Sequence, residues 1–187
     1  METHIEHKIW TDEELMSLPE VEGKCELVNG ELVQEWCGLL HAVLAARLGA
    51  AMGDFARDHD LGYALGSGLG CRMSRGNLRS PDVSFVTKDR ALRMGKDIVA
   101  FLQGAPDLTV EIVSPSDSLH ALKKKAAEYF ENGCSLCWIV EPSLKAVLVM
   151  RPDGSETLLT SKDAIDGEDL LPGFGFQVGD LFEGLHY

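Results

Sequence analysis

The stretch Ala105–Pro142 decides the fold and reads APDLTVEIVSPSDSLHALKKKAAEYFENGCSLCWIVEP. Alternating and apolar runs predict one strand over Asp107–Val113 and a second strand over Leu136–Val140. Between them, apolar residues at helical spacing predict a helix that runs to about Asn132. A helix between two such strands is a candidate right-handed crossover, which places both strands parallel in one sheet.

The residues that flank this helix predict its ends. Ser116 or Asp117 is the expected N-cap, because a short polar side chain accepts hydrogen bonds from the free amides of the first turn. Gly133 is the expected C-cap, since glycine readily adopts the left-handed conformation that ends many helices.

Three further elements are expected toward the N-terminus. Thr11, with Glu14 three residues later, predicts a capping box for a short helix over Trp10–Leu18. The pair Asn29-Gly30 lies between two alternating runs and predicts a hairpin, because both positions of its turn need a positive φ. The pattern over Leu39–Asp58 is that of a long helix with one apolar side.

The remaining elements complete an α/β fold. A strand is expected over Pro81–Val86, after a glycine-rich segment that predicts an irregular strand, and two more strands are expected around the turn Pro152-Asp153-Gly154. We therefore expect a mixed β-sheet flanked by helices, with an N-terminal β-hairpin. Residues 1–187 are expected to form a single domain, with a core over about 24–160 and a covering segment over 166–187.

Composition narrows the classes of protein. The net charge of -13, from 30 acidic and 17 basic residues, argues against non-specific nucleic-acid binding, which needs a positive surface. The acidic, polar start METHIEHKIWTDEEL lacks the features of a secretory signal, and no apolar run approaches the roughly 18 residues that span a bilayer. These patterns predict a cytoplasmic protein with no membrane contact.

Two acids and a lysine occur where a charge is costly. Glu111 interrupts an apolar strand, so burial requires that its carboxylate be paired, bound to a metal or protonated. Lys125, between Leu122 and Tyr129 on the following helix, lies beside the inward stripe and is expected to reach that carboxylate. Asp82 lies on another strand that we expect nearby, and such a trio can bind a divalent metal and activate water.

These residues also have plainer interpretations. Lys125 and Glu111 can form a salt bridge without chemistry, Asp82 can cap a turn, and Tyr129 can be a core aromatic rather than a residue that positions Lys125. Asp107 is excluded as the partner of Glu111, because four residues along one strand separate them by about 13 Å.

The ordered motifs resemble a known family. They are CELVNGELV (25–33), SPDVSFV (80–86), APDLTVEIVSPSD (105–117), KKKAAEYFENG (123–133), CWIVEP (137–142) and LPGFGFQVGDLF (171–182). As a set they resemble the Uma-two family of bacterial proteins classed as restriction endonucleases, a branch of the PD-(D/E)xK nuclease superfamily. The resemblance runs from about Thr11 to Phe182. It implies a restriction-endonuclease-like core and a metal site for Mg²⁺, with Mn²⁺ as a substitute.

The resemblance also implies site residues. Asp82 matches the first acid of the superfamily and Glu111 the second, and the backbone carbonyl of Ile112 is the expected third metal ligand. The superfamily usually places its lysine two residues after the second acid, where this chain has Val113, so the lysine is displaced to Lys125.

Three further polar positions match the family, namely Glu26, Glu31 and His41, and we take Glu31 and His41 as additional catalytic candidates. The implied reaction is hydrolysis of DNA, and cleavage of two strands by two sites suggests a homodimer by analogy.

Two alternatives belong to other classes of protein. The fold could serve as a non-catalytic binding or dimerisation module, which an exposed apolar patch without a basic groove beside Asp82 would favour. A basic rim around the acidic pair would favour the nuclease. A thiol or zinc protein that uses Cys134 and Cys137 is weaker, because a single CxxC supplies half of a structural zinc site. Five cysteines, an odd number, also argue against a disulfide framework.

Overall fold

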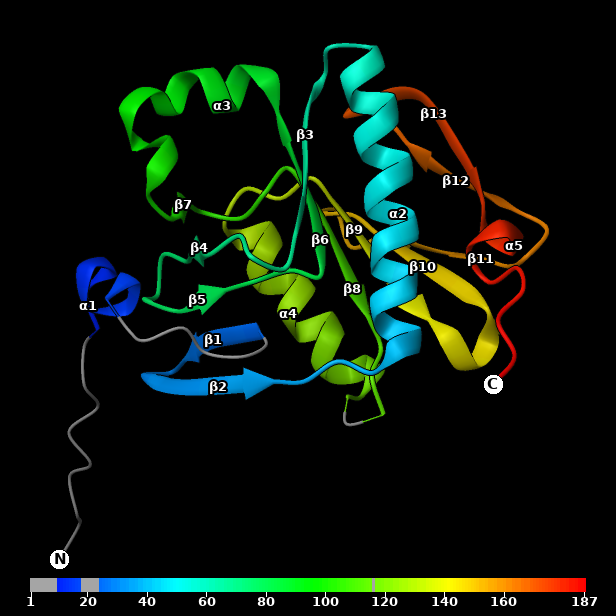
Figure 1. Cartoon of the computed structure of the whole chain (residues 1–187), viewed down its shortest axis with the longest axis horizontal. Coiled ribbons are helices and arrows are strands. Elements are labelled where there is room, and N and C mark those ends of the chain that lie inside the picture. The colour runs from blue at the N-terminus through cyan, green and yellow to red at the C-terminus, as the bar shows by residue number, and fades with distance from the viewer. Residues whose placement is uncertain (1–9, 18–23, 116) are drawn as a thin grey trace, which may run out of the picture.

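A six-stranded mixed sheet forms the centre of the protein (Figure 1). The computed structural model describes residues 10–17, 24–115 and 117–187. In spatial order the strands are β11 (Glu156–Leu159), β10 (Ala146–Met150), β9 (Leu136–Glu141), β8 (Leu108–Ile112), β6 (Val83–Thr87) and β3 (Gly62–Gly66). β8 and β9 are parallel, and every other neighbouring pair is antiparallel. The predicted α/β class and mixed sheet are therefore confirmed.

Helix α4 (Leu119–Glu131) connects the two parallel strands, as the sequence predicts. Its N-cap is Ser118, whose hydroxyl accepts from the Ala121 amide, so Asp117 was the wrong choice and Ser116 lies outside the described residues. The carboxylate of Asp117 is used instead by the preceding turn, where it accepts from the amide and hydroxyl of Ser114. At the other end the C-cap is Asn132, not Gly133 as predicted. Gly133 is the next residue and has a φ of 97°.

The two faces of the central sheet pack against different helices. Leu108, Val110 and Ile112 face the larger core, which includes the buried stripe of helix α2 (Leu39–Asp58). Alternation turns Glu111 toward the other face, which α4 covers with Leu122 and Ala126. The period-two pattern of β8 thus separates an apolar face from a face that carries a carboxylate.

A second sheet of five short strands lies beside the first (Figure 1). In spatial order its strands are β2 (Glu31–Glu35), β1 (Lys24–Val28), β5 (Leu78–Arg79), β4 (Cys71–Arg72) and β7 (Leu102–Gln103). β1 and β2 form the predicted hairpin, and both turn residues have positive φ, 51° at Asn29 and 85° at Gly30. The glycine-rich segment contributes β3 to one sheet and β4 to the other, where a single irregular strand was predicted.

The C-terminal segment contributes to the core. It forms the hairpin β12 (Ala164–Gly167) and β13 (Leu171–Gln177), followed by α5 (Val178–Leu181). Several of its apolar side chains are fully buried in the larger core: Ile165, Leu171, Val178 and Leu181.

The other elements are short. They are α1 (Asp12–Met16), α3 (Lys88–Met94) and two 3₁₀ turns, η1 (Gly95–Val99) and η2 (Pro142–Leu144). The capping box of Thr11 and Glu14 is present, but the helix covers Asp12–Met16 with Ser17 as its C-cap, so the predicted extent Trp10–Leu18 was too long.

Helix α2 corrects one statement drawn from the sequence. By length and composition its 20 residues could cross a membrane, although no apolar run was expected to approach that length. In the folded chain, four side chains along one stripe are fully buried in the core: Leu44, Leu48, Met52 and Ala56.

Gly62 gives a test of the packing between β3 and β6. A Cβ at this position, where φ is 150°, would lie 2.2 Å from the carbonyl oxygen of Val86 and 2.9 Å from the amide of Lys88. We expect Gly62→Ala to lower the free energy of unfolding by about 1–3 kcal/mol, measured by urea denaturation. Gly66→Ala on the same strand is the matched control, because its added Cβ meets nothing within 4 Å. Equal stability of the two variants would contradict this packing.

Candidate active site

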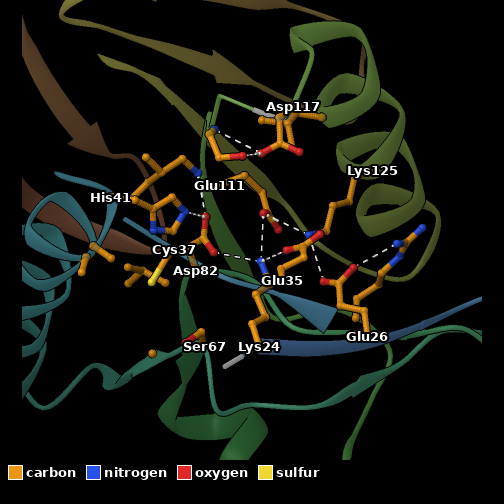
Figure 2. Close-up of a pocket in the computed structure, with 18 of the residues that line it drawn as sticks. Lys24, Glu26, Glu35, Cys37, His41, Ser67, Asp82, Glu111, Asp117 and Lys125 are labelled. Carbon is orange, nitrogen blue, oxygen red and sulfur yellow. Dashed lines mark hydrogen bonds and ion pairs between the residues drawn. The ribbon is translucent and has the colours of Figure 1, made fainter. Parts of the chain in front are cut away.

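One pocket of about 1190 Å³ collects the predicted acids and lysine. Its walls come from the β1–β2 hairpin, the first half of α2, β3, the adjoining ends of β6 and β8, and α4. Figure 2 shows Lys24, Asp82, Glu111 and Lys125 pointing toward one another inside it. Asp82, which immediately precedes β6 rather than lying within it, Glu111 on β8 and Lys125 on the crossover helix therefore share one pocket.

Asp82 is fixed against β8 by backbone hydrogen bonds. Its amide donates to the carbonyl of Val110 at 3.1 Å, and its Oδ2 accepts from the amide of Ile112 at 2.8 Å. These bonds place Asp82 beside the strand that carries Glu111. The turn-capping interpretation of Asp82 is therefore inadequate, because its carboxylate bonds to the neighbouring strand.

Glu111 is buried, with 2% of its side chain exposed, and bonds to two residues of α4. Tyr129 donates its hydroxyl to Oε1 at 2.6 Å, and Lys125 Nζ lies 3.0 Å from Oε2. The salt bridge expected from the sequence is present. Tyr129 is both a buried core aromatic and a donor to Glu111, rather than a partner of Lys125.

Lys24 is the main residue that the sequence analysis missed. Its Nζ lies 2.8 Å from Asp82 Oδ1 and 3.6 Å from Glu111 Oε2, and only 10% of its side chain is exposed. The sequence holds a weak signal for it, because Lys24 and Glu26 are two apart on a strand and so share a face.

Glu26 connects the acidic pair to a second set of charges. Its Oε1 lies 2.9 Å from Lys125 Nζ and accepts from the amide of Ser80 at 2.8 Å. Its Oε2 lies 3.1 Å from Arg79 Nη1, and Arg79 also pairs with Glu128 at 2.6 Å. The hairpin position that the family resemblance indicated therefore contacts the catalytic candidate Lys125.

Of the two additional catalytic candidates, His41 lies in the pocket and Glu31 does not. His41 Nε2 lies 3.0 Å from Asp82 Oδ2, so α2 contributes this residue to the pocket. Glu31 is exposed, pairs with Val28 at the turn end of the hairpin and does not line the pocket. Glu35, opposite Lys24 on β2, is the acid of that strand that lines it.

Burial and neighbouring charge shift the pKa values in opposite directions. Burial raises the pKa of Glu111, and the ammonium groups of Lys125 and Lys24 counter this rise. Burial opposes ionisation of Asp82 too, but the hydrogen bond with His41 and the charge of Lys24 hold its pKa well below the usual range. Burial would lower the pKa of Lys24, yet the carboxylates of Glu111, Asp82 and Glu26 raise it. The acidic pair thus has one strongly acidic and one weakly acidic member.

Mg²⁺ commonly uses one or two carboxylates together with waters and substrate phosphates. Asp82 and Glu111 offer two hard oxygen donors that already share one cation, the ammonium of Lys24. Among the described residues, no three His, Cys, Asp or Glu side chains form a ready-made metal cluster. The residues fit Mg²⁺ held partly by water and phosphate, and they do not fit an all-protein cage.

The surroundings of Asp107, Cys134 and Cys137 do not support a role for these residues in a metal or thiol site. Asp107 accepts from the Thr87 amide at 2.8 Å and pairs with Arg90 at the far end of β8, away from Glu111. Cys134 and Cys137 are buried free thiols, and burial raises the pKa of Cys134 to about 11. A thiol that stays protonated is a poor metal ligand and a poor nucleophile.

Comparison with known proteins agrees with this architecture. The fold is similar to the crystal structure of "a putative nuclease belonging to DUF820" from Anabaena variabilis ATCC 29413, with a TM-score of 0.78 and 21% identity. The similarity covers 92% of this chain and 97% of that chain, so this is the restriction-endonuclease-like fold. Over residues 12–179 the chain matches the Uma2 family, described as "Putative restriction endonuclease", and it belongs to that family. No curated protein matches the chain.

The bond between Tyr129 and Glu111 predicts a measurable stability effect. Tyr129→Phe would leave Glu111 Oε1 buried without its donor, so we expect the free energy of unfolding to fall by about 1–3 kcal/mol. Urea denaturation measures this change. The control is Tyr63→Phe, since Tyr63 is 55% exposed. If both variants unfold like the wild type, the hydroxyl of Tyr129 does not stabilise Glu111.

Proposed function

We propose that the protein is a metal-dependent nuclease that hydrolyses DNA phosphodiester bonds, with Asp82, Glu111 and Lys125 as its catalytic residues. One observation carries the proposal: two buried carboxylates, one on β8 and one just before the neighbouring β6, share a single cation position at the wall of a large pocket. Burying such charges costs several kcal/mol per ion before pairing, and a purely structural role is often served as well by apolar residues.

Asp82 and Glu111 would hold Mg²⁺ or Mn²⁺, with the backbone carbonyl of Ile112 proposed as a third ligand. When bound, the metal would lower the pKa of a water and neutralise charge on the phosphoryl oxygens. His41 and the Ile112 amide fix the orientation of Asp82, and Tyr129 fixes Glu111.

Lys125 would act on the reacting phosphate or water. Its ammonium is held between Glu26 and Glu111 at 2.9 and 3.0 Å, and the residue lines the pocket. Donors fixed in advance stabilise developing negative charge without having to reorganise during the reaction. Lys125 would therefore orient the attacking water or neutralise charge in the transition state.

The pocket wall offers both cationic and apolar groups to a polyanion. Lys124 is exposed on its rim, and Trp36, which is 69% exposed, also lines it. An aromatic face can stack on a base, and an ammonium can contact a phosphate. These groups support DNA as the substrate despite the negative charge of the whole chain.

Cleavage of DNA is the direct test. We expect wild-type protein to nick supercoiled plasmid with Mg²⁺ or Mn²⁺ but not with EDTA, and Asp82→Asn to lose at least about 100-fold of that rate. Asp107→Asn is the control, because Asp107 also follows a proline on the sheet yet lies outside the pocket.

Nicking that survives Asp82→Asn would place the chemistry elsewhere.

Lys125→Ala alone is a poor test of the active site, because it leaves Glu26 and Glu111 buried without their shared cation. Loss of such a cation typically costs about 3–5 kcal/mol of stability.

The second candidate function is a dimerisation module. It is favoured by β2, an edge strand whose five side chains are all exposed, among them Leu32 and Val33. Among the described residues β2 has a neighbouring strand on one side only, and the open edge of a sheet is a template for pairing with a second copy. In this case sedimentation equilibrium would give a dimer that Val33→Lys dissociates. A wild-type monomer at micromolar concentration would remove this candidate and the homodimer together.

A cytoplasmic location is part of the same proposal. A nuclease of this kind would meet its DNA there, and the five cysteines are all free thiols.

A further inference from the structure

We propose that the Lys24 ammonium occupies the cation position between Asp82 and Glu111 in the metal-free protein, and that a divalent metal binds by displacing it. The inference rests on the proposed function, because it concerns the same metal site. It assigns Lys24 a role as an internal competitor of the metal, rather than as a fixed structural residue.

The geometry distinguishes Lys24 from the other cations of the pocket. Among the described residues, Lys24 is the lysine that contacts both acids, at 2.8 Å from Asp82 and 3.6 Å from Glu111. His41 contacts Asp82, and Lys125 contacts Glu111. Figure 2 shows the Lys24 nitrogen between the two carboxylates, where an ion that bridges them would lie.

Repulsion between positive charges disfavours a state in which the Lys24 ammonium and a divalent metal lie between Asp82 and Glu111 together. The acids Glu26, Asp82 and Glu111 have at most 4% of their side chains exposed, and the cations Lys24, Lys125 and Arg79 at most 14%. These three acids and three cations balance one another, and Glu128 beside Arg79 and His41 beside Asp82 add one acid and one ionisable base at the edge of the set. A divalent ion would add two positive charges close to the ammonium, and like charges repel strongly where burial lowers the effective dielectric constant.

A nearby acid gives the displaced ammonium a place to go. Glu35 is the cross-strand partner of Lys24, its Oε2 lies 3.5 Å from Lys24 Nζ, and 44% of its side chain is exposed. Lys24 is the first residue of β1 and has a flexible four-carbon stem. Rotation of this side chain toward Glu35 and the solvent would vacate the acidic pair without moving the strand.

Chemical labelling of the wild-type protein tests the displacement directly. A water-soluble acetylating reagent is applied at limiting dose, with and without saturating Mn²⁺, and mass spectrometry measures the modification of each lysine. We expect Mn²⁺ to increase the labelling of Lys24 severalfold. Lys125 should stay protected in both conditions, and the exposed Lys124 should be labelled equally in both, which provides two internal controls.

Substitution of Lys24 gives a second measurement. Lys24→Met keeps the length of the stem and removes the charge, so we expect Mn²⁺ to bind about tenfold more tightly or better in calorimetry. Lys124→Met removes an exposed charge from the rim of the same pocket and serves as the control. It should gain less affinity than Lys24→Met, because its side chain does not lie between the two acids.

The outcomes separate this inference from the proposed function. Labelling of Lys24 that rises with Mn²⁺ supports displacement, as does Mn²⁺ binding by Lys24→Met alone. Mn²⁺ binding to wild-type protein with Lys24 still protected overturns the inference and leaves the metal-dependent nuclease standing. If neither the wild type nor Lys24→Met binds Mn²⁺, both the inference and the metal site are wrong.

Discussion

Burial of the Glu111 carboxylate within the sheet is the constraint on which the rest of the site depends. A charge at this depth is stable only when cations and hydrogen-bond donors surround it. Helix α4 supplies Lys125 and Tyr129, and the β1–β2 hairpin supplies Lys24. Each lysine also pairs with a second carboxylate. Lys125 pairs with Glu26, and Lys24 pairs with Asp82. Alternation along β8 turns the Glu111 carboxylate toward α4. The charged cluster around it therefore contacts both sheets and the crossover helix.

The parts of this site that depend on local periodicity could be predicted from the sequence. Alternation along β8 places Glu111 opposite the apolar core, and helical spacing places Lys125 on the side of α4 that faces it. These two patterns, together with a short crossover, sufficed for the contact between Glu111 and Lys125. The turn Asn29-Gly30 fixed the hairpin for the same reason, since positive φ is a local requirement.

The parts that depend on docking between distant segments could not be predicted. Lys24 and Asp82 lie 58 positions apart, and the hairpin that brings them together pairs with β5 only through Leu27 and Leu78. Pairing within the hairpin sets Glu35, rather than Glu31, opposite Lys24. The N-cap of α4 was mispredicted because Asp117 and Ser118 are both residue types that cap helices. The Asp117 carboxylate bonds to Ser114 instead, and Ser118 caps the helix.

The hairpin that carries Lys24 and Glu26 precedes most of its partners in the chain. During synthesis from the N-terminus, Glu26 emerges long before Lys125, and Lys24 long before Glu111. The charges of the hairpin must therefore stay hydrated until the crossover unit β8-α4-β9 has been made and has folded. The site therefore cannot close before α4 has been synthesised, and a nascent chain lacking α4 has acids without the lysine that later joins them. The site therefore cannot assemble until synthesis has passed β9, which ends at Glu141.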